Sequence, residues 1–147
     1  ASGGFTCGRQ PIVELLRQKS RPYLFSNSLA PAITAAAIAV IDYLASSPGL
    51  LTTLRENTAY FRRRIVEEGF EVPESDHPIV PVMIGDAVLA AKMADAILAR
   101  GVYVRAFSFP VVPRGKARIR TQLSAALTRE DLDEAVAAFV AARAEVA

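Results

Sequence analysis

The sequence predicts an α/β fold in which helices pack against one small sheet, preceded by a mainly helical N-terminal segment. Residues that start and stop helices flank the runs with helical periodicity. Two short apolar runs and one alternating run have the pattern of strands. In the second half of the chain these elements follow one another as helix, β, α, β, β, α, which is typical of an α/β sandwich.

The first 46 residues are expected to be helices joined by a polar connection. We expect a helix over about 11–19 and a short extended piece at Tyr23–Phe25. The polar residues 26–28 then precede a helix from Pro31 to about Ala45. A domain boundary is expected near Ser46–Ser47, which divides the chain into 1–46 and 47–147.

Residues 22–41 contain no charged side chain. A membrane span needs about 20 mostly apolar residues. Pro22, the polar residues 26–28 and Pro31 break this run, so we expect no membrane span. Its second part, 31–41, is apolar on every side, which indicates a helix that is buried all round or forms an oligomer interface.

In the second part, Ser47 and Pro48 are a strong helix start, and Gly69 is a stop after about Glu68. Residues 78–84 form an apolar strand candidate. Asp86 is then the expected cap of a helix that places Leu89, Met93 and Ile97 on one face and ends before Gly101.

Residues 102–107 predict a second strand, and the loop 110–116 leads to a third. Side chains on a strand point alternately to opposite faces. The third strand therefore has two faces: Ala117, Ile119, Thr121 and Leu123 on one, and Arg118, Arg120, Gln122 and Ser124 on the other. Thr128–Asp131 resembles a capping box that opens a last helix to about Val146.

Arg120 is the candidate binding residue of this strand, because a guanidinium on a rigid strand can bind a carboxylate through two parallel hydrogen bonds.

The composition of the chain limits which classes of function are possible. An apolar fraction of 52% predicts a folded core, and a net charge of +2 is too small to indicate nucleic-acid binding. We expect the basic run Arg62–Arg64 to be a solvated helix face.

Cys7 is the single cysteine and His77 the single histidine of the chain. A disulfide within the chain and a multi-His metal centre are therefore excluded, and we expect no metal. A Ser-His-Asp triad would have to use His77. Its context, Ser75–Pro78, is more typical of a polar turn before a strand. No targeting motif is present, and we expect a cytoplasmic location.

Three segments carry a resemblance to a known family: 1–6, 21–31 and 110–122. They are similar to the α-oxoamine synthases, and among these to the 2-amino-3-ketobutyrate coenzyme A ligases (glycine C-acetyltransferases). The resemblance implies a homodimeric enzyme with pyridoxal phosphate on the fold-type I transferase scaffold. It implies that 1–46 is the tail of the large cofactor-binding domain with a linker helix, and 47–147 the small C-terminal domain.

The resemblance also implies roles for single residues. Ser26 and Asn27 match positions that reach the cofactor phosphate of the neighbouring subunit, and Arg120 matches the arginine that binds the substrate carboxylate. Arg118 matches no substrate-binding position, so we expect it to be structural. From the residues alone, a plain helix cap at Ser26–Asn27 and a solvent-facing Arg120 remain open.

The Schiff-base lysine of the family would precede Ala1. The three lysines of the chain, Lys19, Lys92 and Lys116, match no such position, and we expect ordinary surface lysines. The chain therefore has no expected catalytic residue and is expected to be inactive alone. Leu127 departs from the family pattern, which often has His there.

The reaction implied for the complete enzyme is glycine + acetyl-coenzyme A ⇌ 2-amino-3-ketobutyrate + coenzyme A, a step of threonine catabolism. Two alternatives stay open. One is another α-oxoamine synthase, of the aminooxononanoate or aminolevulinate synthase type. The other is a non-catalytic α/β oligomerisation domain, which the uncharged helix would suit.

Overall fold

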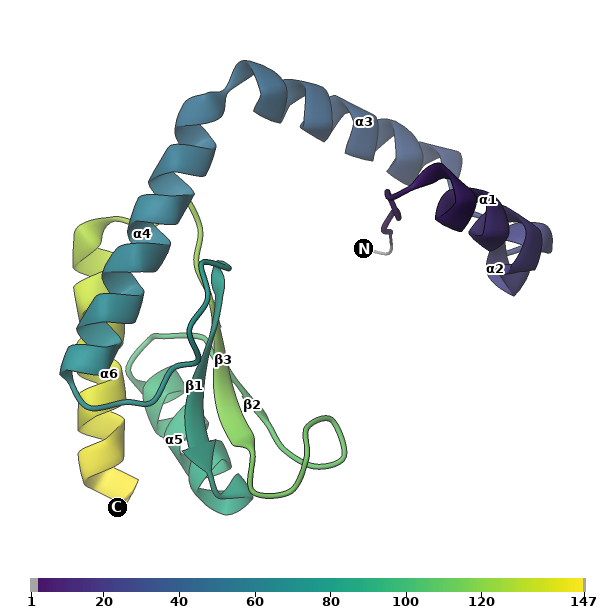
Figure 1. Cartoon of the computed structure of the whole chain (residues 1–147). Helices are drawn as coiled ribbons and strands as arrows, with labels where there is room; N and C mark the ends of the chain where they lie inside the picture. The colour runs from purple at the N-terminus through teal and green to yellow at the C-terminus, as the bar shows by residue number, and fades with distance from the viewer. Residues whose placement is uncertain (1–2, 147) are drawn as a thin grey trace. The chain divides into compact units, whose positions relative to one another are not determined.

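The computed structural model describes residues 3–146 and divides the chain into two compact units, residues 1–48 and 49–147 (Figure 1). The helices are α1 Gln10–Lys19, α2 Arg21–Leu24, α3 Pro31–Ser46, α4 Pro48–Glu67, α5 Ala87–Ala99 and α6 Arg129–Val146. The strands are β1 Ile79–Gly85, β2 Arg105–Phe107 and β3 Ala117–Gln122. The predicted α/β fold class is confirmed.

In the first unit, α1 and α3 lie where the sequence predicted them, but the extended piece at Tyr23–Phe25 was wrong. The chain forms the short helix α2 instead, with the Leu24 N–H 3.0 Å from the Ser20 carbonyl oxygen. The reason is Pro22 in the first turn of α2. Proline fixes a helical φ, and its missing N–H has no helical partner at that position.

The helix α3 is apolar, yet none of its residues is buried within this chain. Ile38, Val40, Ile41 and Tyr43 are each 50–61% exposed. The prediction that this helix is buried on all sides is therefore wrong for the chain by itself. The alternative, that the helix forms an oligomer interface, stays a prediction. Over residues 3–146, no single helix has the length and apolar composition of a membrane span. The helices α3 and α4 reach that length and composition only when they are counted together across Ser47.

The second unit contains a three-stranded antiparallel sheet with β3 in the centre, in the order β1-β3-β2. The predicted strand over 102–107 is shortened to β2, because its first half is bound elsewhere. The Val102 N–H donates to the Ile97 carbonyl oxygen at 3.3 Å, at the end of α5, and the Val104 side chain is buried in the core.

The predicted helix caps of α5 and α6 are confirmed. The Asp86 Oδ1 accepts from the Leu89 N–H at 2.8 Å. Thr128 and Asp131 form the expected reciprocal pair: the Thr128 Oγ1 accepts from the Asp131 N–H at 3.2 Å, and the Asp131 Oδ2 accepts from the Thr128 N–H at 2.8 Å. These bonds satisfy N–H groups that have no partner within the helix.

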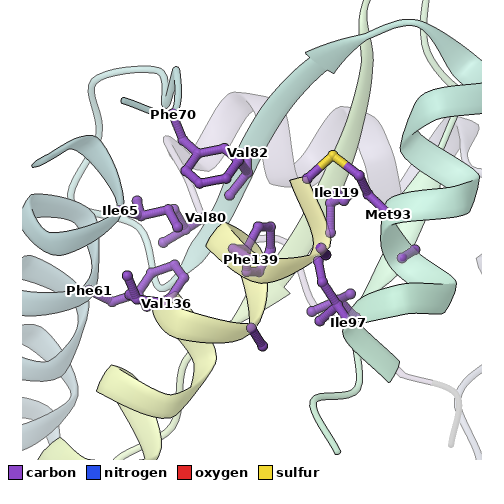
Figure 2. Packing of buried hydrophobic residues seen from close by; sticks show 14 of the residues in the cluster. Phe61, Ile65, Phe70, Val80, Val82, Met93, Ile97, Ile119, Val136 and Phe139 are labelled. Carbon is purple, nitrogen blue, oxygen red and sulfur yellow. The ribbon is translucent and has the colours of Figure 1, made fainter. Parts of the chain in front are cut away.

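The core lies between the sheet and helices α4, α5 and α6, which contribute side chains to the same cluster (Figure 2). Its most completely buried members include Phe61, Ile65, Val80, Val82, Met93, Ile97, Ile119, Leu132 and Phe139. The rings of Phe70 and Phe139 meet edge to face at 5.7 Å between centroids. Because Ile119 and its same-face neighbours point into this core, the other face of β3 is free to carry polar groups.

A polar contact joins α4 to α6 beside this core. The Tyr60 hydroxyl donates to Asp133 at 2.8 Å, and the Arg64 Nε lies 3.3 Å from Asp133 Oδ1. The hydrogen bond from Tyr60, followed by the hydrogen bond and charge of Arg64, lowers the pKa of Asp133 below its usual value. The same hydrogen bond raises the pKa of Tyr60.

We predict that Asp133→Asn makes the stability of the fold less sensitive to acid. A carboxyl whose pKa is lower in the folded than in the unfolded state stabilises the fold above the unfolded value of about 3.9, and this contribution is lost as the pH falls through the folded pKa. Urea unfolding midpoints between about pH 3 and pH 6 should therefore fall more in the wild type than in Asp133→Asn.

The control is Asp95→Asn, which changes an exposed α5 carboxylate that has no hydrogen bond or ion pair with a residue in the described range. It should follow the wild-type curve. Equal acid sensitivity of the wild type and Asp133→Asn would contradict the assignment.

Candidate functional site

Arg120 lies on the central strand β3, on the face opposite the core, as predicted. Its backbone is paired on both sides, with Pro81 of β1 and Arg105 of β2 as the directly opposed residues. The side chain is exposed, while its chain neighbours Ile119 and Thr121 are buried. The Arg120 Nη2 donates to the Gln122 Oε1 at 3.2 Å. A fixed backbone and one polar contact therefore orient the guanidinium, and most of its N–H donors stay available.

Two hollows on this face share Arg120. The first has a volume of about 400 Å³ and is lined by Arg62, Pro73, Ser75, His77, Ile79, Pro81, Phe107, Val112, Arg118 and Arg120. The second has a volume of about 420 Å³ and is lined by Tyr103, Val104, Arg105, Phe107, Arg120, Gln122, Leu123 and Ser124. Each hollow is large enough for a small carboxylate ligand.

Arg105, Arg118 and Arg120 make this face of the sheet cationic. Within residues 3–146 the ion pairs are those of Arg63, Arg64 and Arg100, so no carboxylate neutralises the three sheet arginines. Guanidinium groups that lack a carboxylate partner attract anions, and their planar shape matches that of a carboxylate.

Arg118 lies beside Arg120 but faces a different partner. Its Nε donates to the Lys116 carbonyl oxygen at 3.2 Å and so holds the end of the 110–116 loop. This contact fits the structural role expected for Arg118, although its side chain also lines the first hollow.

The prediction that Arg62–Arg64 form a solvated helix face was wrong for Arg62. Its guanidinium donates to the carbonyl oxygens of Pro73 at 2.9 Å and His77 at 3.0 Å. Its Nε is buried and has no hydrogen-bond partner among residues 3–146. Burial lowers the pKa of Arg62, and the negative charge of Asp76 opposes that shift. Arg62 thus fixes the connection that forms one wall of the first hollow.

His77 lies in a turn before β1, as predicted. Its Nδ1 accepts from the Ile79 N–H at 3.0 Å, and the Ser75 Oγ accepts from the His77 backbone N–H at 3.1 Å. In the described range no hydrogen bond joins the Ser75 hydroxyl to the imidazole, so these two residues do not form a nucleophile and base pair.

Asn57 is a positioning residue that the sequence reasoning missed. It is 4% exposed on α4, and its Nδ2 donates to the carbonyl oxygens of Ser124 at 3.1 Å and Leu127 at 2.8 Å. These bonds fix the turn that follows β3. An available signal was an Asn one helical turn before the apolar Phe61, on the same face. The departure at Leu127 has a packing explanation, because this side chain contacts the core.

Ser26 and Asn27 lie in the first unit, in the connection between α2 and α3 and before the N-cap Ala30. Both line a hollow of about 1060 Å³ that also contains the polar side chains of Thr6, Arg17, Ser20 and Ser28. Hydroxyl, amide and guanidinium donors of this kind suit a phosphate group. Neither Ser26 nor Asn27 has a side-chain hydrogen bond within residues 3–146, so their donors are available.

The site residues expected from the sequence therefore belong to two units, with Ser26 and Asn27 in the first and Arg120 in the second. Lys19, Lys92 and Lys116 are all exposed. Across residues 3–146, no group of three or more His, Cys, Asp or Glu side chains is placed to hold a metal ion.

Comparison with known proteins decides the family. The model of the family "Aminotransferase class I and II" matches residues 1–139. The chain belongs to this family. Together with the 52% identity to 2-amino-3-ketobutyrate coenzyme A ligases, this match confirms the family resemblance predicted from the sequence.

Relatives within the family are close to the chain in sequence. The chain is 52% identical to the mitochondrial 2-amino-3-ketobutyrate coenzyme A ligase of Mus musculus, over 95% of this chain and 34% of that protein. It is 47% identical to the 8-amino-7-oxononanoate synthase of Symbiobacterium thermophilum, over 93% and 35% respectively. The chain thus spans about a third of the length of these curated relatives.

The solved structure of serine palmitoyltransferase from S. paucimobilis shares the fold. It superposes on the chain with a TM-score of 0.81 at 30% identity, covering 93% of this chain and 35% of that one. That structure is of a lysine-to-alanine variant with a pyridoxal phosphate–myriocin aldimine bound.

We predict that Arg62→Ala destabilises the second unit. The carbonyl oxygens of Pro73 and His77, and more weakly that of Ile79 at 3.5 Å, would lose their charged donor. Because the half-buried site lets water replace part of these contacts, the free energy of unfolding should fall by about 1–3 kcal/mol. The measurement is urea unfolding followed by circular dichroism.

The matched control is Arg63→Ala, which removes the same charge from the next residue. Arg63 is exposed and lies 3.6 Å from Glu67, an ion pair that contributes less than about 1 kcal/mol. If the free energy of unfolding falls equally in both variants, the hydrogen bonds of Arg62 do not stabilise the 73–79 connection.

Proposed function

We propose that the chain is the C-terminal part of a pyridoxal phosphate-dependent acyltransferase that joins glycine and acetyl-coenzyme A to give 2-amino-3-ketobutyrate and coenzyme A. The reverse reaction would serve threonine catabolism. The observation that carries the proposal is Arg120, an exposed guanidinium on a rigid central strand with no described carboxylate partner. The 52% identity to a 2-amino-3-ketobutyrate coenzyme A ligase supports the choice of reaction.

Arg120 would bind the carboxylate of glycine through two parallel hydrogen bonds. Holding the carboxylate fixes the rotation of the molecule about Cα, and therefore decides which Cα bond is presented for cleavage. Orientation of this kind lowers the barrier, because the rotational entropy is already lost on binding and is not lost again in the chemical step. The contact of Arg120 with Gln122 limits the motion of the guanidinium and so reduces the entropy lost on binding.

Pyridoxal phosphate, when bound, supplies an electron sink for a carbanion at Cα. Ser26 and Asn27 would donate hydrogen bonds to its phosphate, and in the proposed homodimer they serve the neighbouring subunit. The exposed apolar side chains of α3 support such an assembly, because apolar surface of this kind is typical of interfaces. Residues 1–46 would then be the tail of the large domain and 47–147 the small domain.

We predict that Arg120→Gln in the complete enzyme lowers kcat/KM for glycine by roughly 10²-fold, which corresponds to the loss of a charge-assisted bidentate contact. KM for acetyl-coenzyme A should change little. Steady-state kinetics with each substrate varied in turn measures both values.

The control for Arg120→Gln is Arg55→Gln, which removes the same charge from an exposed position on α4. It should retain wild-type kinetics. An Arg120→Gln enzyme with unchanged kcat/KM for glycine would contradict the assignment of the carboxylate to Arg120.

The 147-residue chain by itself is proposed to be inactive, since its three lysines are exposed and match no Schiff-base position. On addition of pyridoxal phosphate we expect only slow, nonspecific labelling of Lys19, Lys92 and Lys116. Near-visible absorbance and mass spectrometry measure this directly. A stoichiometric adduct at one lysine, together with turnover of glycine, would overturn the proposal.

Two other functions have specific support. Another α-oxoamine synthase is favoured by the 47% identity to 8-amino-7-oxononanoate synthase, and assays of acetyl-, succinyl- and longer acyl-coenzyme A with glycine, alanine and serine separate these enzymes. A non-catalytic oligomerisation domain is favoured by the exposed apolar α3. In that case Arg120→Gln would leave glycine binding unchanged.

A further inference from the structure

A second arginine lies directly opposite Arg120. In the antiparallel ladder of β2 and β3, Arg105 is the register partner of Arg120. Directly opposed residues share one face of the sheet, with their Cβ atoms about 5 Å apart. Both side chains are exposed, and both line the second hollow. Arginine side chains are long and flexible, so the two guanidinium groups can reach the same small ligand.

The pairing is electrostatically unfavourable without an anion. Like charges on directly opposed strand positions destabilise a sheet. Within residues 3–146, no ion pair or side-chain hydrogen bond involves Arg105. Among the described residues, the only polar side-chain contact of Arg120 is with the neutral amide of Gln122, so no described residue compensates the positive charge of the pair.

The surroundings of the two arginines also suit a small oxyanion. Gln122, Ser124 and Tyr103 line the same hollow, and each has a polar group that donates hydrogen bonds. The Ser124 Oγ accepts from the Ala126 N–H at 3.2 Å, which leaves its own hydrogen to donate. Arg118 is less suited to share this ligand, because its Nε is directed to the Lys116 carbonyl oxygen and it does not line this hollow.

We propose that Arg105 is a second carboxylate-binding residue, and that Arg105 and Arg120 together hold one small carboxylate between strands β2 and β3. This inference rests on the proposed function, which assigns the substrate carboxylate to Arg120. It adds that affinity for the carboxylate depends on both guanidinium groups, and that the second hollow is the one occupied.

The test is an NMR titration of the 147-residue chain with acetate and with glycine at constant ionic strength. The Arg Nε–Hε resonances of the wild type report on each guanidinium without any substitution. We expect those of Arg105 and Arg120 to shift together with one dissociation constant, while that of Arg55 stays fixed. Movement of Arg120 alone would overturn the role of Arg105 and leave the proposed function in place.

Variants give the magnitude. Arg105→Gln should weaken acetate binding by about tenfold or more, as expected for the loss of a charge-assisted hydrogen bond, and Arg105→Lys should retain part of the affinity. The matched control Arg55→Gln should change it less than about twofold, because an exposed charge outside the hollow acts only through screened solvent.

The remaining outcomes separate the two proposals. If Arg120→Gln abolishes binding and Arg105→Gln does not weaken it, only the role of Arg105 is overturned. If neither variant changes binding, both the role of Arg105 and the carboxylate assignment of Arg120 are overturned. If chloride displaces acetate at equal concentration, the pair attracts anions without recognising a carboxylate, and the proposal fails.

Discussion

The double pairing of β3 is the constraint on which the rest of the second unit depends. Strands on both sides fix its backbone, so alternate side chains must point to opposite faces. One face carries Ile119 at the centre of the core, against α4, α5 and α6 (Figure 2). The other carries Arg118 and Arg120. A register slip of one residue would place guanidinium groups in the core and expose Ile119, so the burial that stabilises the fold also positions the candidate binding residue.

The walls around Arg120 are held by polar groups from the same helix. Arg62 bonds the 73–79 connection, and Asn57 bonds the turn after β3, both from α4. Both side chains donate to backbone carbonyl oxygens, whose positions are fixed by the sheet and the turns. The helix thus has two roles: its apolar residues complete the core, and its polar residues fix segments around the sheet face that carries Arg120.

The first unit differs, because its helices expose most of their apolar surface within this chain. The side chains of Ser26 and Asn27 have no hydrogen-bond partner in the described range, and the α3 helix that follows them exposes Ile38, Val40 and Ile41. Covering exposed apolar surface with another surface removes it from water, which stabilises the assembly. The proposed phosphate contact and the proposed dimer therefore depend on the same segment.

The sequence by itself determined the α/β order, the caps at Asp86 and Thr128, and the two faces of β3, because these follow from local hydrogen bonding and from the period of two in a strand. Its motifs also determined the family. It did not determine the start of β2, since the Val102 N–H binds the last turn of α5. Nor did it determine the contacts of Arg62, whose acceptors lie 11 and 15 residues away. Nor did it bring Arg105 beside Arg120. Strand register is set by contacts between distant segments, so only the tertiary structure decided which arginine shares the candidate site.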